Sequence, residues 1–345
     1  MRSASESGAD LTNCGRFPTT ENTFTGRTVF EAGQRTGRGR TIEAVAANVP
    51  PLNAHITPRE WQRLLARVGG GHCTPFLGAG ACAGTLPLGG DVARRWAQEE
   101  GYPLDDDWDL PRVAQFVSVN GDPMWPKEKI CSELRGIGPP DFDRPGEPHA
   151  VLAELPIRIF VTTNYDDFMV QALRRAGKTP HRELCRWNDF LDGTPSVFDA
   201  AGGFVPSVDE PVVYHLHGTL DVPESIVLTE DDYLDFLVSV SRRQNVLPLQ
   251  VQSALASTSL LFLGYSLADA NFRVLHRGLV ATSPPGLRRL SVAVQLPPRD
   301  SETARTYLGR YFNAMSVIVY WGDASEFAET LRQKWVEHAA ETHAA

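Results

Sequence analysis

Apolar residues recur along this chain with two spacings, which predict alternating helices and strands. Trp61, Leu64 and Val68 recur at helical spacing, and the segment 57–60 before them combines an N-cap threonine, a proline at the first helical position and a capping-box glutamate. Short apolar runs predict strands at 73–77, 157–163, 212–216, 225–228, 260–264, 290–296 and 316–320. Because helical patterns separate several of these runs, we expect an α/β fold with βαβ crossovers, a mostly parallel sheet and helices on both of its faces.

The chain is expected to contain one folded domain with segments of different character. Residues 1–50 are rich in Ser, Gly, Thr and Arg and poor in aliphatic residues, so we expect this stretch to be disordered. We expect a single domain over 55–340, with a helical insertion at about 90–150, where prolines and glycines interrupt helical patterns. Residues 190–211 are rich in Gly, Pro, Asp and Ser, which predicts a long irregular connection and a candidate lid or partner-contact loop. A last helix at 324–338 should pack on the core.

Composition narrows the class of protein. The 345 residues carry 42 acidic and 33 basic side chains, a formal net charge of -9, which argues against direct nucleic-acid binding. Five scattered cysteines form no CxxC pair, so neither a disulfide framework nor a zinc site is indicated, and a reducing, cytoplasmic setting is expected. No apolar run reaches the roughly 20 residues that a membrane-spanning helix needs, so we expect no membrane partner.

Polar side chains follow the predicted strand at 157–163. Asn164 and Asp166 alternate after its end, so their side chains can point to one face. The carboxyl ends of parallel strands are where open α/β sheets bind ligands, which makes both residues candidates for holding a polar substrate. The alternative is helix capping, because Asp166 or Asp167 can start the helix that follows.

Two glycine-containing turns follow apolar runs. Gly78-Ala79-Gly80 lets a backbone approach a diphosphate with no Cβ in the way, although position 83 is alanine where the full dinucleotide fingerprint needs glycine. A plain tight turn explains this segment equally well. Gly264-Tyr265-Ser266 repeats the arrangement after the run at 260–263, where Ser266 can also simply cap a helix.

Two histidines lie at alternate positions before a glycine, in His215-Leu216-His217-Gly218. A histidine at a strand end is suited to general base catalysis, because its unperturbed pKa of about 6.5 is close to physiological pH. The alternatives are a hydrogen-bonded core imidazole and a metal pair, for which the spacing indicates no third ligand.

In order and content these four segments resemble the sirtuin family: a Gly-Ala-Gly turn, a Thr-x-Asn-x-Asp strand end, a His-Gly after a strand and a later Gly-x-Ser turn. The resemblance covers roughly residues 73–319. Within the family it is similar above all to the zinc-free sirtuin-like NAD hydrolase domains of prokaryotic antiphage defence systems, in its Thr-Thr-Asn-Tyr-Asp, His-Leu-His-Gly and Gly-Tyr-Ser-Leu-x-Asp-x-Asn segments. It implies a Rossmann-like fold that binds NAD.

The resemblance also implies two sets of site residues. The catalytic set is Asn164, Asp166 and His217, with His217 as the base. The cofactor-binding set is Gly78, Ala79, Gly80, Thr163, Gly264 and Ser266. Two departures separate the chain from deacetylase sirtuins: no cysteine follows Cys185, so their zinc module is absent and no metal is expected, and residues 86–91 replace their Pro-Asp-Phe-Arg.

From this resemblance we expect a NAD hydrolase that releases nicotinamide and ADP-ribose, acting as a defence effector that depletes NAD. Two alternatives stay open: a NAD-dependent protein deacylase or ADP-ribosyl transferase, and a non-catalytic NAD or ADP-ribose sensor or scaffold. Because uncontrolled NAD hydrolysis would poison the host, we expect a homo-oligomer or a regulatory partner, such as an ATPase or an Argonaute-like protein.

Overall fold

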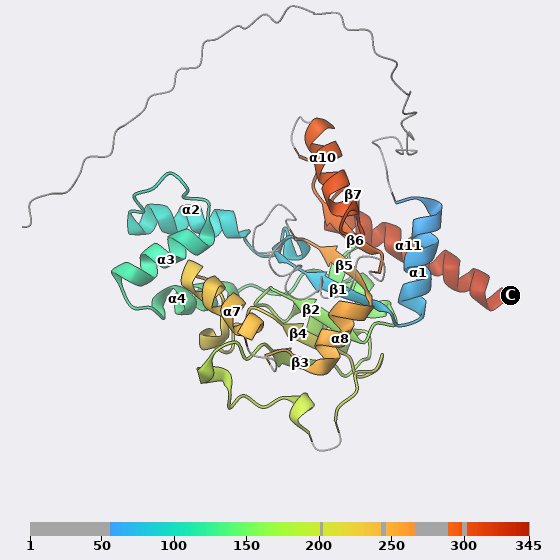
Figure 1. Ribbon diagram of the computed structural model, residues 1–345, viewed down its shortest axis with the longest axis horizontal. Helices are drawn as coiled ribbons and strands as arrows, with labels where there is room; N and C mark the ends of the chain where they lie inside the picture. Colours follow the sequence, from blue (N-terminus) through green and yellow to red (C-terminus); the bar gives the residue numbers. More distant parts are fainter. Residues whose placement is uncertain (1–55, 201–202, 243–245, 266–288, 299–301, 345) are drawn as a thin grey trace, which may run out of the picture. The chain divides into compact units, whose positions relative to one another are not determined.

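The protein is described here by a computed structural model, which covers residues 56–200, 203–242, 246–265, 289–298 and 302–344. Within these residues one sheet has seven strands, all paired in parallel, in the order β3-β4-β2-β1-β5-β6-β7 (Figure 1). The strands are β1 (Cys73–Leu77), β2 (Ile159–Thr162), β3 (His181–Leu184), β4 (Val212–His215), β5 (Ser259–Leu263), β6 (Ser291–Gln295) and β7 (Val317–Trp321). The predicted α/β fold with a parallel sheet is confirmed.

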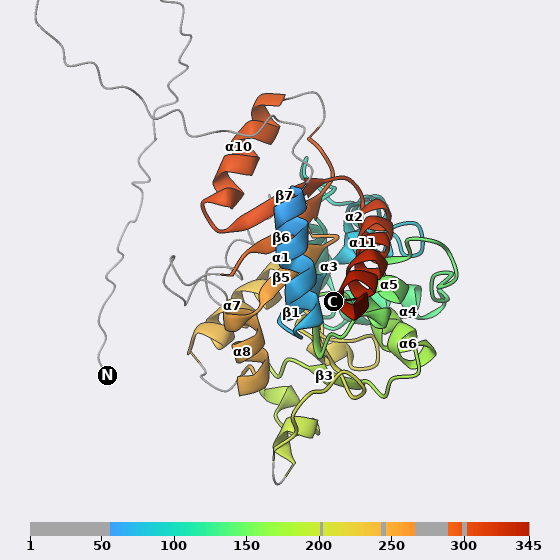
Figure 2. The same ribbon diagram turned by 90° about the vertical axis from the view of Figure 1, so that its right-hand side faces the viewer.

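Helices cover both faces of the sheet, as predicted (Figure 2). One face packs against α1 (Pro58–Gly69), α5 (Pro148–Glu154), α6 (Phe168–Arg175) and α11 (Ala324–Ala344). The other packs against α7 (Glu230–Arg242), α8 (Leu249–Ser257) and α10 (Glu302–Asn313). The alternation of strand side chains produces this division: Leu261 and Leu263 of β5 join the first core, and Leu260 and Phe262 join the second.

The first and last helices follow the sequence pattern. In α1 the Thr57 hydroxyl accepts the backbone N–H of Glu60, and the Glu60 carboxylate accepts the backbone N–H of Thr57 at 2.7 Å, which is the predicted capping box. In α11, Phe327 and Leu331 are fully buried in the core.

The predicted helical insertion consists of α2 (Gly89–Glu100), α3 (Leu110–Asn120) and α4 (Trp125–Arg135). These helices share a separate core, which includes the buried Trp96 and Ile130 and also takes in Ile226 and Leu228. The strand predicted at 225–228 is therefore wrong. A 3-10 turn, η4 (Pro223–Ser225), ends at the first of these residues. Ile226 and Leu228 are then buried against the helices of the insertion, while Val227 packs on the core beside the sheet.

Two further expectations have a mixed outcome. Residues 190–211 contain no strand or α-helix among the described positions, only part of η2 (Asp189–Leu191) and η3 (Val197–Asp199), so the predicted irregular connection is confirmed. The lid or partner-contact role stays a prediction. Residues 1–55 and 266–288 lie outside the described part of the chain, so the expected disorder of 1–50 also stays a prediction.

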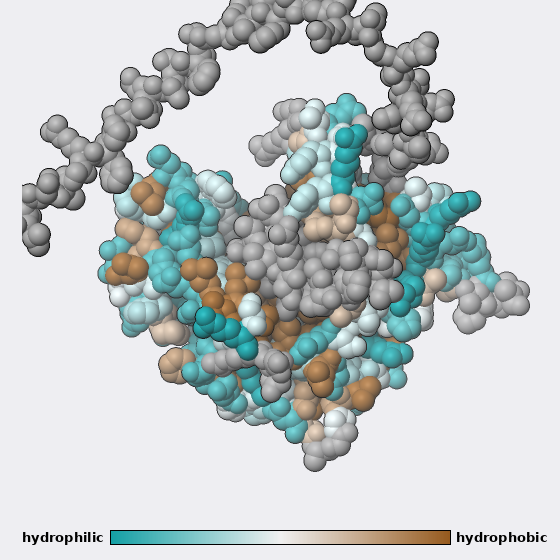
Figure 3. Space-filling model, viewed as in Figure 1, coloured by the Kyte–Doolittle hydropathy of each residue, from teal (hydrophilic) through white to brown (hydrophobic). Residues whose placement is uncertain are grey.

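The surface carries apolar residues over α7 (Figure 3), where Leu234 and Val238 are 60% and 45% exposed. Among the described residues, no helix combines the length and apolar character needed to cross a membrane.

Candidate active site

The order of the strands reverses at β1. From β1 the chain builds β2, β3 and β4 on one side of it, and β5, β6 and β7 on the other. Open α/β sheets bind ligands beyond the carboxyl ends of the strands at this reversal. Here those ends are Leu77 and Leu263, which are register partners and are followed by Gly78 and Gly264.

The two glycine turns cross each other at van der Waals contact. Gly78 donates its N–H to the Leu263 carbonyl at 2.9 Å, and Gly80 donates its N–H to the Gly264 carbonyl at 2.9 Å. A Cβ on Gly264 would lie 2.5 Å from the Gly80 carbonyl carbon, and Gly264 also has φ +71°, so no other residue fits without strain. The glycines are thus needed for the backbone crossing itself, whatever binds there. Ala79, the first residue of η1 (Ala79–Cys82), is exposed at the tip of the turn.

Thr163 and Asn164 join the end of β2 to this crossing. Thr163 donates its N–H to the Leu77 carbonyl at 3.0 Å. The Asn164 side chain donates from Nδ2 to the Gly78 carbonyl at 3.1 Å and to Cys82 Sγ at 3.2 Å. The glycine turn thus holds the Asn164 carboxamide. The residue as a whole is only half-buried, so part of it stays accessible.

Asp166 serves the capping purpose considered for it and also contacts Cys82. Its Oδ1 accepts the backbone N–H of Phe168 at 3.0 Å, which caps the start of α6, while its Oδ2 accepts the Cys82 thiol at 3.4 Å. Asn164 and Asp166 therefore meet at the same sulfur atom, as their alternation predicts. The neighbouring Asp167 occupies the N-cap position without a capping side-chain bond.

The two histidines lie in different surroundings. Nδ1 of His215 donates to the Asn164 carbonyl at 3.1 Å. His217, after the end of β4, packs edge-on against the rings of Tyr233 and Phe236, at centroid distances of 5.3 and 5.1 Å. Burial lowers the pKa of both imidazoles, that of His217 to about 3.

Both imidazoles keep an unpaired nitrogen. Among the described residues, Nε2 of His215 and Nε2 of His217 are buried without a hydrogen-bond partner. Each such buried polar atom costs stability unless a water or a ligand supplies the missing hydrogen bond. No described hydrogen bond connects His217 to Asn164 or Asp166.

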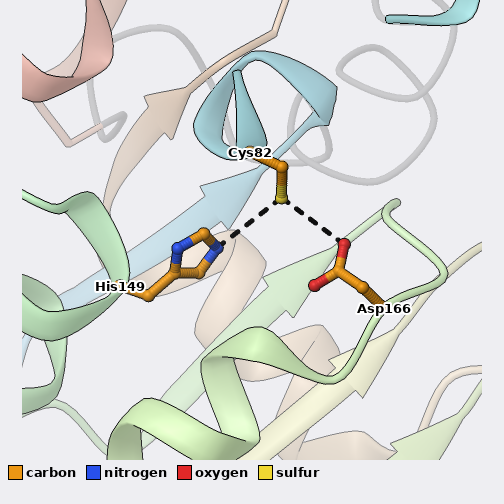
Figure 4. A group of neighbouring side chains, drawn as sticks. All are labelled: Cys82, His149 and Asp166. Atoms are coloured by element: carbon orange, nitrogen blue, oxygen red, sulfur yellow. Dashed lines mark hydrogen bonds between the residues drawn. The ribbon is translucent and has the colours of Figure 1, made fainter. Parts of the chain in front are cut away.

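A second polar group lies beneath the glycine turn, and the sequence did not predict it (Figure 4). Nε2 of His149 is 3.8 Å from Cys82 Sγ, and Nδ1 of His149 donates to the Glu147 carboxylate at 2.7 Å. All three residues are at most 2% exposed. They come from η1 and from the start of α5, more than 60 residues apart in sequence, and no spacing signals their meeting.

The order Glu147, His149, Cys82 matches that of a nucleophilic triad, but the electrostatics do not. Burial and the nearby Asp166 carboxylate raise the pKa of the Cys82 thiol well above its ordinary value. Burial alone would raise the pKa of Glu147, yet the hydrogen bond and electrostatic attraction of His149 and the backbone hydrogen bonds of Ala150 and His149 together outweigh it and hold that pKa below its usual range. The thiol therefore stays protonated and acts as a hydrogen-bonding group.

Cys82, His149 and Asp166 could also hold a metal ion, since their ligand atoms lie within 4.8 Å of one another. Each carboxylate of the group already accepts a hydrogen bond from the protein. Glu147 accepts the Ala150 N–H and caps α5, Asp166 caps α6, and His149 pairs with Glu147, so each buried carboxylate is stabilised by a helix N-terminus.

Comparison with known proteins matches the part of the chain that contains most of these residues. The family model of the SIR2-like domain matches residues 158–317, which include Thr163, Asn164, Asp166, His217 and Gly264. The match covers just under half of the chain. The match begins after Gly78–Gly80, and Ser266 lies inside it but outside the described residues.

Two relatives have names that describe an activity. NAD(+) hydrolase ThsA of Acinetobacter baumannii (strain 532279) is 29% identical over 201 residues, 57% of this chain and 36% of that protein. NAD(+) hydrolase ThsA of Enterococcus faecium is 30% identical over 176 residues, 51% of this chain and 33% of that protein. The predicted resemblance to sirtuin-like NAD hydrolases is thus confirmed. The aligned part spans about a third of the length of these relatives.

A solved structure from work on the mechanism and regulation of Sir2 enzymes overlays with a TM-score of 0.36 and 11% identity, across 82% of this chain and 99% of that one. The fold assignment rests on the chain's own sheet order.

Proposed function

We propose that this chain hydrolyses NAD at the bond between nicotinamide and ribose, releasing nicotinamide and ADP-ribose. The observation that carries the proposal is the position of Asn164 against the glycine crossing, at the carboxyl ends of β1 and β5. The names of the relatives supply the substrate.

The reaction requires the site to position the ribose and the attacking water, and it does not require protonation of the leaving nicotinamide. Nicotinamide is bound to ribose through a positively charged nitrogen, so it leaves with the bonding electron pair as a neutral molecule, and positive charge develops on the ribose. Nδ2 of Asn164 is engaged by Gly78 and Cys82. Its Oδ1 is then the atom that accepts a hydrogen bond from the ribose or from the attacking water. Asp166 holds the hydrogen bonds of the pocket.

His217 takes the proton in this proposal. As water attacks the ribose carbon and the bond to nicotinamide breaks, the water loses a proton to Nε2 of His217. That nitrogen is buried and unpaired. The lowered pKa keeps the free ring neutral at physiological pH and makes it a weak base, but a water that has attacked a positively charged ribose is acidic enough to give its proton to a weak base. Binding of the ligand near the ring would complete the missing hydrogen bond.

The cofactor would lie over the glycine crossing. Gly78, Ala79, Gly80 and Thr163 would line the diphosphate side, with Gly264 and Ser266 on the adenosine side. Because the N–H groups of Gly78 and Gly80 already donate to β5 and to the turn after it, the glycines would contribute close backbone approach rather than these two donors.

Mass analysis of the products after incubation with NAD tests the proposal. We expect nicotinamide and free ADP-ribose in equal amounts. O-acyl-ADP-ribose in the presence of an acylated peptide, or ADP-ribosylated protein, would indicate a deacylase or a transferase instead. NAD that stays intact over hours while bound would indicate a sensor or scaffold.

We further propose that the activity serves in cytoplasmic defence by depleting NAD, and that assembly or a partner protein controls it. Leu234 and Val238 on α7 offer an exposed apolar surface for a second copy of the chain. Turnover per molecule that rises with protein concentration, together with a dimer or larger species in light scattering, would support this control. Equal turnover at all concentrations would contradict it.

A further inference from the structure

We propose that Glu147, His149 and Cys82 are positioning residues, which hold the Asn164 carboxamide and the Asp166 carboxylate in their reactive arrangement. This inference rests on the proposed NAD hydrolysis and deepens it. None of the three residues needs to touch the substrate.

The argument begins with the sulfur atom. Cys82 donates its thiol hydrogen to Asp166 Oδ2 at 3.4 Å and accepts a hydrogen bond from Asn164 Nδ2 at 3.2 Å. One side chain therefore sets the distance and the orientation of both polar groups. Without the sulfur, Asp166 Oδ2 loses its donor, and the Asn164 carboxamide keeps only the Gly78 carbonyl and can rotate about its side-chain bonds.

The second step is what fixes the sulfur. Nε2 of His149 lies 3.8 Å from Sγ on the side away from Asp166 (Figure 4), and the ring is locked by its 2.7 Å hydrogen bond to Glu147. The ring also packs edge-on against Phe168, at a centroid distance of 6.1 Å. Cys82 thus has one allowed environment, bounded by an imidazole on one side and a carboxylate on the other.

The third step is the rigidity of the anchors. Glu147 accepts the Ala150 N–H at 2.6 Å at the start of α5, and Asp166 accepts the Phe168 N–H at the start of α6. These helices pack on one another and on the sheet through buried residues such as Leu152 and Val170. The contacts that run from Glu147 through His149 and Cys82 to Asp166 therefore connect the starts of two fixed helices. Cys82 lies in the glycine turn that crosses Gly264. Such buried supports keep a site within the small tolerance that catalysis requires.

Substitutions of Cys82 separate positioning from packing. Serine keeps a hydroxyl that can donate to Asp166 and accept from Asn164, whereas alanine removes both bonds. We expect Cys82→Ala to lower kcat for NAD by about tenfold or more, since a small misplacement of a catalytic group has effects of this size, while KM changes less than about threefold. Cys82→Ser should recover most of the lost kcat. Cys131→Ala, which removes another buried thiol in the helical insertion, is the matched control and should leave kcat unchanged.

The outcomes are distinguishable. If the parent protein does not consume NAD, the proposed function is wrong, and the inference that rests on it is wrong as well. If the parent is active and Cys82→Ala turns over NAD as fast as Cys82→Ser, the inference alone is overturned. A rise in KM with unchanged kcat would also overturn it, because that result assigns the group to binding.

A second variant and a metal analysis complete the test. Glu147→Gln keeps an oxygen to cap α5 but removes the charge that fixes His149, and it should lower kcat in the same way even if Cys82→Ala does not fold. Elemental analysis of the purified protein should find less than about 0.1 zinc per chain. One zinc per chain that disappears in Cys82→Ala would replace the positioning role with a metal site.

Discussion

His217 makes the free energy of unfolding depend on pH, by an amount that follows from its pKa. The ring is buried against Tyr233 and Phe236, and its pKa falls to about 3 in the folded state, against about 6.5 in the unfolded chain. Between these two values the unfolded chain binds the proton and the folded protein does not. Stability attributable to this residue is therefore fully present above about pH 6.5 and is lost progressively as the pH falls toward 3.

The size of the effect follows from the shift. Each unit of pH below the unfolded pKa costs about 1.4 kcal/mol until the folded pKa is reached, so about 2 kcal/mol is lost by pH 5. His217→Phe removes the titrating group while keeping an aromatic ring against Tyr233 and Phe236. His215, whose pKa burial also lowers, is present in both proteins, so its contribution cancels in the difference.

Urea unfolding of the parent and of His217→Phe, at about pH 7.5, 6.5, 5.5 and 5, measures this difference. The parent should lose about 2 kcal/mol more than the variant across that interval. Stability curves that run parallel would show that burial does not lower the pKa of His217.

Two further predictions concern the scaffold. Gly264→Ala should destabilise the protein by about 3 kcal/mol or more in urea unfolding, because its Cβ would overlap Gly80 and Ala81 at a positive φ. The control Gly136→Ala, at a position with open space around it, should change stability by less than about 1 kcal/mol. Equal effects of the two substitutions would contradict the argument that the backbone crossing needs glycine. Lys127→Ala should cost about 3 kcal/mol, because it leaves the buried Asp232 carboxylate without its 2.6 Å ion pair; a loss below about 1 kcal/mol in the same assay would show that this carboxylate needs no counter-ion.

Much of the sheet could be predicted from local pattern. Six strands are apolar runs whose residue types alone predict burial: β1, β2, β4, β5, β6 and β7. Strand β3 was missed because its residues, His181–Leu184, are mostly polar, as an edge strand permits. The run at 225–228 was assigned to the sheet because burial of a loop against the helices and beside the sheet selects the same apolar residues as burial in a strand.

The candidate site also contains features that could be predicted from the sequence and features that could not. The proximity of Asn164 and Asp166 could be predicted, because the two residues alternate in sequence directly after a strand. The support from Glu147, His149 and Cys82 could not, because Cys82 meets His149 across 67 positions of sequence and Asp166 across 84. Likewise the need for glycine at 264 arises where two turns cross, which no local pattern encodes. Contacts between distant segments carry the information that the sequence analysis lacked.

The most direct test of the account is the rate of NAD consumption by Asn164→Ala beside that of Asn120→Ala. Asn120 is an exposed asparagine at the end of α3 whose Nδ2 donates to the Phe116 carbonyl, and its substitution controls for the loss of a carboxamide away from the site. We predict that the parent and Asn120→Ala release nicotinamide and ADP-ribose at the same rate, while Asn164→Ala is slower by about a hundredfold or more. Equal rates for Asn164→Ala and the parent would contradict the central claim that this carboxamide organises the reaction.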